Sequence, residues 1–159
     1  MSRPVPQCAV DLVKSFEGCE LLAYPDPGTG GAPWTIGYGC TGPNIFKGLT
    51  ITQDDAEEWL VADLQKAGDT VLRFTGAVGL TDNQYGALIS FVYNVGGGNF
   101  ATSTLLTHVK AGEFDAAAGE FGKWNHAAGR VLPGLTARRA AEAELFLSLI
   151  HISEPTRPY

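Results

Sequence analysis

The sequence contains little charge, little cysteine and no long hydrophobic run, and each of these shortages excludes a class of protein. Charged residues make up only 18% of the 159 residues and 45% are hydrophobic, which excludes an intrinsically disordered chain. No segment approaches the roughly 20 consecutive apolar residues of a transmembrane helix. The first residues contain no basic segment followed by an apolar run, so we expect no secretory signal peptide. The formal net charge of −6 argues against a nucleic-acid-binding protein, which usually has a basic face.

Cysteine and histidine are too few for a scaffold held by disulfides or metal. The three cysteines, Cys8, Cys19 and Cys40, are odd in number and form no CxxC pair. The three histidines show no zinc-ligand spacing. We therefore expect reduced thiols, as in a protein made in the cytoplasm, and we predict no metal site.

The length suits one domain, which would bury roughly 70% of the surface of its unfolded chain. The start of the chain predicts a short helix, because Val10, Val13 and Phe16 recur at helical spacing. Gly18 is typical of a helix C-terminus. We therefore expect Glu17 at the very end of this helix.

A segment rich in glycine and proline follows the first helix. Seven of the 20 glycines and four of the nine prolines lie between Pro25 and Gly48, and this predicts turns rather than helices. Short runs at Leu21–Tyr24 and Trp34–Tyr38 have the composition of strands. The sequence therefore predicts a small antiparallel sheet within a β lobe of about Cys19–Thr50.

The rest of the chain, about Thr52–Leu147, has apolar residues at helical spacing. Thr52 followed by Asp55, and Thr81 followed by Gln84, indicate two helix starts, the second as a capping box. Three glycines end the second of these helices, and shorter helices are expected around Thr104–Lys110, Phe114–Trp124 and Thr136–Leu147. The sequence thus predicts an α+β fold, with a small glycine-rich β lobe and a larger helical lobe joined by the helix from Thr52.

The last residues differ in composition from the helix before them. The stretch LSLIHISEPTR, from Leu147 to Arg157, resembles the translation of a sequencing-library transposase adapter. We expect the natural sequence to diverge at about Leu147 and Ser148–Tyr159 to be a non-native tail. The alternative is a genuine polar tail, and resequencing the gene with a different library chemistry distinguishes the two.

Two carboxylates near the N-terminus indicate acid–base chemistry. Glu17 is expected at the negative end of a helix dipole and beside apolar residues, and both effects favour the protonated carboxyl that a general acid needs. Asp26 lies between Pro25 and Pro27 at the tip of a turn, where a solvated carboxylate stays ionised. Thr35 begins a strand that faces this turn and offers a hydroxyl to hold a water. Carboxylates in such contrasting settings are typical of enzymes that cleave glycosidic bonds, although such pairs also occur by chance.

The segment FEGCELLAYPDPGTGGAPWTIGYG carries a more specific pattern: a Glu that ends the first helix, an Asp in an A-Y-x-D turn, and the Thr of T-I-G-Y-G. This pattern resembles the catalytic signature of the phage-type lysozymes, the endolysin muramidases of the T4 lysozyme family. The similarity extends through LTDNQYGALISFVYNVGGGNF and RVLPGLTARRAAEAELFL, and so covers nearly all of residues 8–147. The resemblance implies a lysozyme-like catalytic domain over residues 1–147, with the active-site cleft between its β lobe and its helical lobe.

The resemblance also implies a role for each catalytic residue. Glu17 would be the general acid that protonates the leaving glycosidic oxygen, and Asp26 and Thr35 would position and activate the attacking water on the opposite face, giving inversion. The bond cut would be the β-1,4 link between N-acetylmuramic acid and N-acetylglucosamine. A retaining reaction with Asp26 as nucleophile needs the two carboxyl groups about 5 Å apart, against about 6.5 Å or more for inversion, and it stays open from sequence alone.

The sequence departs from the family pattern in three places. The loop Pro27–Pro33 is longer than in the best-known member, so we expect some change in how the water is positioned. Cys40 stands where a histidine is usual after T-I-G-Y-G, so we expect a loss of stability but not of chemistry. The net negative charge of the chain, unlike the basic character of familiar members, should weaken its attraction to an anionic wall.

Five residues are candidates for substrate binding, each with a structural alternative. Tyr38 lies on the β lobe, and Asn94 lies near the end of the central helix and, by the resemblance, faces the cleft. Trp124 either stacks on a sugar ring or packs in the core. Arg138 and Arg139 open the last helix and either bind the anionic peptide or lactyl group of the wall or form a solvated face.

The resemblance implies a monomeric endolysin that degrades bacterial peptidoglycan and lyses the host cell, with no metal, nucleotide or other cofactor and no nucleic-acid partner. Without a signal segment, such an enzyme is made in the host cytoplasm and reaches the wall through a membrane pore made by a holin partner. A tail-associated or host-borne copy is equally compatible with the residues. The rival functions are a lytic transglycosylase or chitin-type hydrolase on the same fold, and a non-catalytic wall-binding module, which would not need Glu17, Asp26 and Thr35 together.

Overall fold

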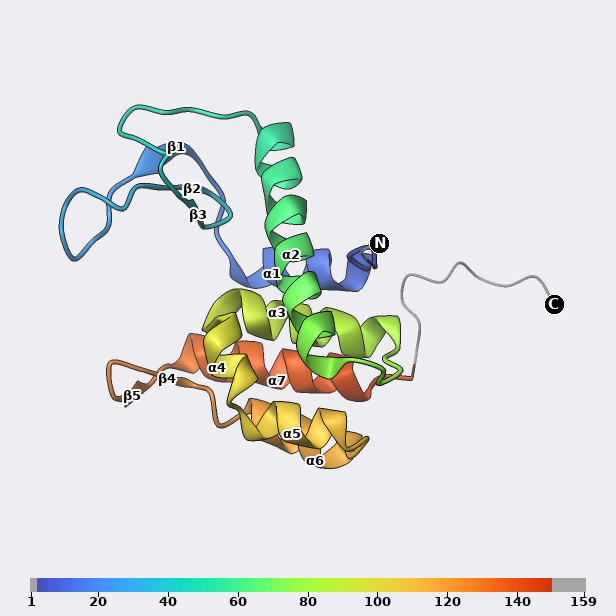
Figure 1. Cartoon of the computed structure of the whole chain (residues 1–159). Coiled ribbons are helices and arrows are strands. Elements are labelled where there is room, and N and C mark those ends of the chain that lie inside the picture. Colours follow the sequence, from blue (N-terminus) through green and yellow to red (C-terminus); the bar gives the residue numbers. More distant parts are fainter. Residues whose placement is uncertain (1–2, 150–159) are drawn as a thin grey trace. The chain divides into compact units, whose positions relative to one another are not determined.

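The computed structural model describes residues 3–149, which divide into two compact units. Residues 13–63 form one unit, which we name the β unit, and residues 3–12 and 64–149 form the other, the helical unit. Helices and a small antiparallel sheet give the predicted α+β class (Figure 1). The elements in chain order are α1 (Gln7–Phe16), β1 (Glu20–Tyr24), β2 (Thr35–Gly37), β3 (Cys40–Thr41), α2 (Gln53–Thr75), α3 (Asp82–Val95), α4 (Gly97–Ala101), α5 (Thr104–Lys110), α6 (Phe114–Phe121), β4 (His126–Ala127), β5 (Arg130–Val131) and α7 (Pro133–Leu147).

The two longest predicted helices begin where their capping side chains predict. At the start of α2, the Thr52 amide donates to Asp55 Oδ2 at 3.1 Å, and the Asp55 amide donates to Thr52 Oγ1 at 3.0 Å. Thr81 and Gln84 form the same reciprocal pair at the start of α3, with distances of 2.9 and 3.1 Å. These bonds satisfy amides that have no acceptor within the helix. Both predicted helix starts are therefore confirmed.

The β unit contains the predicted small sheet. Its strands pair antiparallel in the order β1-β2-β3, with Glu20 opposite Gly37 and Tyr24 opposite Thr35. Both predicted strands are confirmed, whereas the short β3 was not predicted. The core of the sheet consists of Ala23, Ile36 and Cys40, covered by the partly buried side chains of Trp34, Ile45, Leu49 and Ile51.

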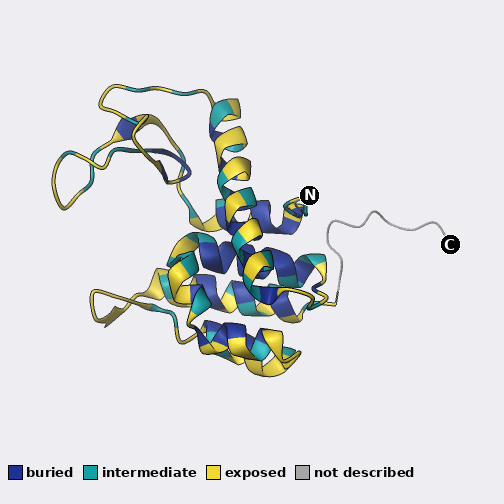
Figure 2. Ribbon diagram, viewed as in Figure 1, coloured by how far each residue is buried: buried dark blue, intermediate teal, exposed yellow. Residues whose placement is uncertain are grey.

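In the helical unit, α3 is the central helix that its apolar sides predict. Every residue from Tyr85 to Val92 is buried (Figure 2). α7 lies beside α3, and α6 contacts both α5 and α7. Phe91 of α3 makes edge-to-face contacts with Phe100, Phe121 and Trp124, with ring centroids 6.3, 5.4 and 5.7 Å apart. Since such pairs contribute about 0.5–1.5 kcal/mol each beyond the area they bury, Phe91 is a major anchor of this core.

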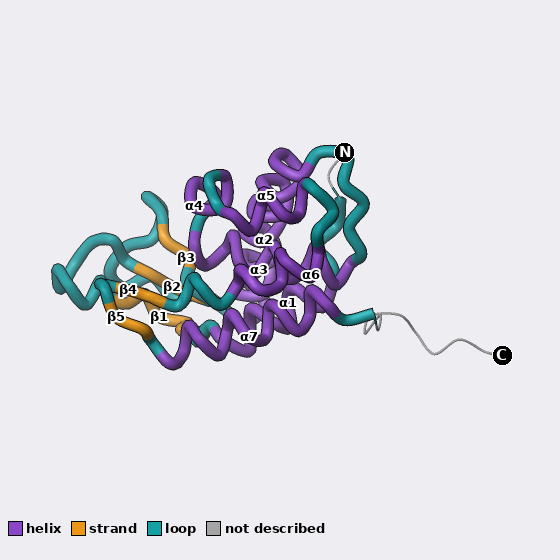
Figure 3. The backbone as a smooth tube through the Cα atoms, turned by 90° about the horizontal axis from the view of Figure 1, so that it is seen from below, coloured by secondary structure: helices purple, strands orange, loops and turns teal. Residues whose placement is uncertain are grey.

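Two features of the helical unit were not predicted. α3 ends at Val95 as the three glycines predict, but the chain re-enters a helix at Gly97, because Gly96 adopts a φ of 94° that turns it into α4. After α6, β4 and β5 form a short hairpin, drawn in orange in Figure 3. Its turn residues Ala128 and Gly129 have φ of 52° and 78°. Positive φ at both central residues is typical of the tight turns that join antiparallel strands.

All three cysteines are free thiols. Cys8 lies in the helical unit, where burial raises the pKa of its thiol to about 11 and so keeps it protonated. Cys40 is buried in the β unit and donates a hydrogen bond to Asp63 Oδ2 at 3.1 Å. The Cys40 thiol therefore bonds a carboxylate of α2.

The C-terminal helix α7 ends at Leu147. The part of the predicted non-native tail from Ile150 to Tyr159 lies outside the described residues. Within residues 3–149, no helix combines the length and apolar character that crossing a membrane requires.

Candidate active site

Glu17 lies at the C-terminal end of α1, as the sequence predicts. The helix ends at Phe16, and the Glu17 amide still donates to the Val13 carbonyl at 2.9 Å, so its backbone continues the last turn. The side chain is half-buried. It lines an open pocket of about 420 Å³ in the β unit, together with Gly18, Glu20, Tyr24 and Gly39. Glu17 therefore borders a hollow that a ligand can enter.

Asp26 begins a loop that closes on itself. Its Oδ2 accepts hydrogen bonds from the amides of Gly28 (3.0 Å) and Thr29 (3.1 Å). Its own amide donates to the Gly31 carbonyl at 2.9 Å. An Asp side chain that bonds the amides just after it is a common way to stabilise a turn. The long loop that follows Asp26 is thus fastened at Asp26 itself.

Thr35 is brought to the same end of the sheet by the pairing of β1 with β2. It lies opposite Tyr24, two residues before Asp26. Within residues 3–149, neither Oδ1 of Asp26 nor the Thr35 hydroxyl makes a hydrogen bond. Both oxygens are therefore available to hold a water.

The three predicted catalytic residues are linked through Tyr24. This residue lines the pocket with Glu17, pairs with Thr35 and precedes Asp26 by two positions. The β unit therefore supplies one carboxyl at a helix end, and a carboxylate and a hydroxyl beside the end of β1. A proton donor and a pair of groups that activate water are the components that hydrolysis of a glycosidic bond requires.

Sequence reasoning missed the two other side chains that line this pocket beside Glu17, those of Glu20 and Tyr24. They lie at the two ends of β1, and the pairing register of β1 shifts between them. Simple alternation along ELLAY therefore gives no signal that would have found them. Tyr24 is 39% exposed and so leaves part of its aromatic ring accessible from solvent.

Tyr38 lies in the β unit near Thr35, as the sequence predicts, and its surroundings favour the structural alternative. It is only 6% exposed. Its hydroxyl donates to Glu57 Oε2 at 2.8 Å and accepts from Gln53 Nε2 at 3.0 Å. Because both the ring and the hydroxyl are engaged within the β unit, we replace its predicted contact with the substrate by a structural role.

Arg138 and Arg139 are buried in the helical unit rather than exposed at the start of α7 as predicted, with 3% and 0% of their surface accessible. Arg139 reaches the buried Glu142 through Nε at 2.7 Å and Nη2 at 3.1 Å, and Arg138 Nε lies 3.4 Å from the same carboxylate. Ser90 Oγ donates to Glu142 Oε2 at 2.6 Å. Since a polymer cannot reach guanidinium groups buried in this way, we replace their predicted contact with the substrate by a structural role.

Asn94 and Trp124 stay predictions as substrate contacts. Asn94 is exposed in the last turn of α3. Trp124 is half-buried, with its ring against Phe91 and its carbonyl accepting from Arg139 Nη1 at 3.5 Å. The Trp124 side chain therefore belongs partly to the core and keeps only part of its surface for a ligand.

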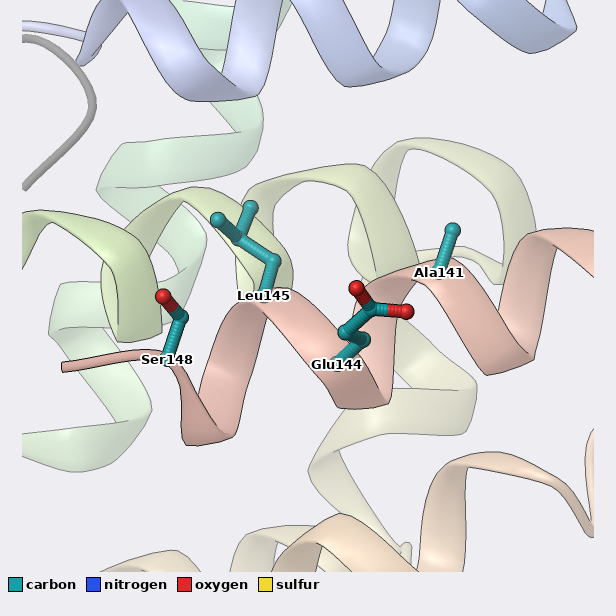
Figure 4. Close-up of a pocket in the computed structure, with 4 residues that line it drawn as sticks. All are labelled: Ala141, Glu144, Leu145 and Ser148. Atoms are coloured by element: carbon teal, nitrogen blue, oxygen red, sulfur yellow. The ribbon is translucent and has the colours of Figure 1, made fainter. Parts of the chain in front are cut away.

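A second pocket lies on α7 in the helical unit (Figure 4). Ala141, Glu144, Leu145 and Ser148 line it, and it contains none of the predicted catalytic residues. Ser148 belongs to the predicted non-native tail. Among residues 3–149, no group of three or more His, Cys, Asp or Glu side chains could hold a metal ion.

Comparison with known proteins points to one family. A family profile described as phage lysozyme matches residues 14–142. An endolysin of Bacillus phage B103 is 42% identical over 144 residues, which cover 91% of this chain and 54% of that protein. A SAR-endolysin of Enterobacteria phage PA-2 is 37% identical over 132 residues, which cover 83% of this chain and 78% of that protein.

A solved structure gives the same result for the fold. The muramidase domain of SpmX from Asticaccaulis excentricus has a TM-score of 0.82 and 34% identity to this chain, covering 93% of this chain and 99% of that structure. The predicted lysozyme-like fold is therefore confirmed. The chain spans about half the length of the Bacillus phage endolysins that it matches.

Proposed function

The chain belongs to the phage lysozyme family, and we propose that it is a muramidase that hydrolyses the β-1,4 bond between N-acetylmuramic acid and N-acetylglucosamine in bacterial peptidoglycan. Relatives described as endolysins and a structural neighbour described as a muramidase domain support the proposal. Cutting this bond in many strands weakens the wall until the cell lyses.

One observation of the site carries the proposal. Glu17 and Tyr24 line one pocket, and the pairing of Tyr24 with Thr35 places this threonine beside the start of the Asp26 loop. A module that only binds the wall needs no acid, carboxylate and hydroxyl in this arrangement. An inverting hydrolase uses an acid together with groups that activate the attacking water.

In the proposed mechanism, Glu17 donates its proton to the glycosidic oxygen as the bond to the anomeric carbon breaks. A water held by Oδ1 of Asp26 and the Thr35 hydroxyl attacks that carbon from the opposite face, and Asp26 takes the proton that the water loses. The product sugar then has inverted configuration and a new reducing end. Attack by water on the face opposite the leaving group is the reason for inversion.

The test of this reaction is the chemistry of the new ends. Purified sacculi are incubated with the protein, the loss of turbidity is followed, and the released fragments are identified by mass spectrometry. We expect clearing with reducing N-acetylmuramic acid ends. Anhydro-muramic ends would instead identify a lytic transglycosylase, and cleavage of chitin oligomers without clearing of sacculi would redirect the assignment to a chitin-type hydrolase.

Asp26→Asn is expected to lower the rate of clearing by about 100-fold or more, because the variant cannot accept a proton from the attacking water. The side-chain oxygen of Asn can still accept from the Gly28 and Thr29 amides, so the loop should keep its shape. Asp54→Asn, at an exposed position in the first turn of α2, is the control and should clear sacculi at the wild-type rate. Full activity of Asp26→Asn would instead favour a route that needs only Glu17.

We further propose that a pore made by a holin-type partner gives the enzyme access to the wall of the cell that produces it. Peptidoglycan lies outside the cytoplasmic membrane, so an enzyme folded inside needs a passage to reach it. We expect cells that express the chain to lyse only after a pore is opened. Lysis at the same rate without a pore would contradict this proposal.

A further inference from the structure

A hydrogen-bonded cluster in the β unit joins α1, α2 and the turn after β2. We call Lys14, Cys19, Tyr38, Gln53 and Glu57 the α2 cluster, because Gln53 and Glu57 of α2 hold it together. Oε1 of Glu57 accepts from Lys14 Nζ at 2.6 Å. Its Oε2 accepts from the Tyr38 hydroxyl at 2.8 Å and from Gln53 Nε2 at 2.7 Å. Both carboxylate oxygens of Glu57 are therefore in use.

The amide of Gln53 is oriented by the same cluster. Its Nε2 donates to Tyr38 as well as to Glu57, at 3.0 and 2.7 Å. Its Oε1 accepts from the Cys19 thiol at 3.7 Å. Hydrogen bonds from Lys14, then from Tyr38 and Gln53, hold the pKa of Glu57 below its ordinary value. Glu57 thus stays ionised, and the cluster stays intact, at neutral pH.

The α2 cluster contacts the chain on both sides of Glu17. Lys14 lies three residues before Glu17, one helical turn away, and Cys19 lies two residues after it. Tyr38, in turn, lies three residues after Thr35. The same two side chains of α2 are therefore bonded to the helix end that carries Glu17 and to the turn that follows Thr35.

The exposure of the Lys14–Glu57 ion pair indicates that this pair adds little to stability. The side chains of Lys14 and Glu57 are 35% and 36% exposed, and ion pairs at such positions contribute little to the free energy of folding. Catalysis responds more strongly to position, because a displacement of about 1 Å at a reacting group can lower a rate by about 100-fold. A small movement of Glu17 would therefore affect turnover much more than stability.

We propose that Glu57 and Gln53 are positioning residues that keep Glu17 at a fixed position relative to Thr35 and Asp26. This inference rests on the proposed hydrolysis. Neither residue needs to contact the substrate. Their role is to fix the end of α1 and the end of β2 to one rigid support, the first two turns of α2.

Glu57→Ala is the first test. We expect kcat on soluble peptidoglycan fragments to fall at least tenfold, with KM within twofold and a melting temperature within a few degrees of wild type. Glu57→Gln keeps an acceptor for Tyr38 but loses the charge that attracts Lys14, so its kcat should be intermediate. Glu58→Ala removes the exposed carboxylate of the next residue and should leave kcat unchanged. A kcat of Glu57→Ala within twofold of the control would overturn the proposal.

A second measurement does not depend on turnover. Exchange of the Glu17 backbone amide, which donates to the Val13 carbonyl at 2.9 Å, is followed by NMR in wild type, Glu57→Ala and Glu58→Ala. We expect this exchange to be faster in Glu57→Ala alone, because the end of α1 is then no longer held. If wild type fails to cleave the wall, the proposed function falls, yet faster exchange still supports positioning. If wild type is active and both the exchange rate and kcat are unchanged in Glu57→Ala, positioning falls and the proposed function stands.

Discussion

Glu17→Gln is expected to lower the turnover of peptidoglycan by about 1,000-fold or more while leaving the fold intact. A Gln side chain has the same shape as Glu but cannot release a proton to the glycosidic oxygen, and general acid catalysis contributes about 100- to 10,000-fold to a rate. Glu17 is half-buried at the end of α1, so an isosteric change should fit without repacking. The measurement is the initial rate of clearing of sacculi together with the amount of new reducing ends.

Two control measurements show whether the expected loss in Glu17→Gln is a loss of acid catalysis rather than of binding or of a surface charge. Co-sedimentation with sacculi should show that Glu17→Gln still binds glycan, since the pocket around it is unchanged. Glu58→Gln, an exposed carboxyl on α2, should clear sacculi as fast as wild type. If Glu17→Gln kept its lytic activity, Glu17 would not be the acid.

Arg139→Met is expected to lower the free energy of unfolding by about 3–5 kcal/mol at pH 7, the usual result of removing one partner of a buried ion pair. Arg139 is fully buried, lies 2.7 Å from Glu142 and stacks over the Phe91 ring at 5.2 Å. Met fills part of the space but brings no charge. Glu142 is then left with the more distant Arg138, 3.4 Å away, as its cation. Urea denaturation measures the loss.

The effect of Arg139→Met should also depend on pH. Burial raises the pKa of Glu142, and Arg139 and Arg138 oppose that rise. Without Arg139, the folded carboxyl binds its proton at a higher pH still. A carboxyl whose pKa is raised on folding loses stability as pH increases through the folded value, so the deficit should be larger at pH 7 than at pH 5.

Arg130→Met is the matched control for the buried arginine. Arg130 is exposed in β5, and a surface substitution of this kind usually changes the free energy of unfolding by no more than about 0.5 kcal/mol. Equal losses in the two variants, or a loss from Arg139→Met that does not change between pH 5 and pH 7, would contradict the importance of the buried ion pair.

The parts of the fold that the sequence predicts correctly depend on local signals. Thr52 with Asp55 and Thr81 with Gln84 cap α2 and α3 through side chains only three residues away, so their spacing in the sequence was sufficient. The hairpin of β4 and β5 was missed because each strand has only two residues, too few for an alternating pattern. α4 was missed because a run of glycines signals the end of a helix but not the start of another.

In the candidate site, too, the residues predicted best are those whose signals lie close by in the sequence. Glu17 was located by the helix before it and the glycine after it. The sequence could not decide between substrate contact and a structural role for Tyr38, because its partners Gln53 and Glu57 lie 15 and 19 positions further along the chain. Arg138 was misplaced because the groups that accept its hydrogen bonds include the carbonyl of Ser90, 48 positions away. Glu142, three and four residues beyond the two arginines, was the one local sign that these cations have a partner.

The closed turn at Asp26 makes the exposed part of this loop less tolerant of engineered change than its position suggests. Exposed loop tips are where insertions are usually tolerated. Here, however, the Gly30 amide donates to the Asp26 carbonyl at 2.8 Å, and Gly30 has a φ of 72°, a conformation that favours glycine. An affinity peptide grafted at Gly30 would therefore break the turn that begins at Asp26, and insertions in this segment belong outside residues 26–31.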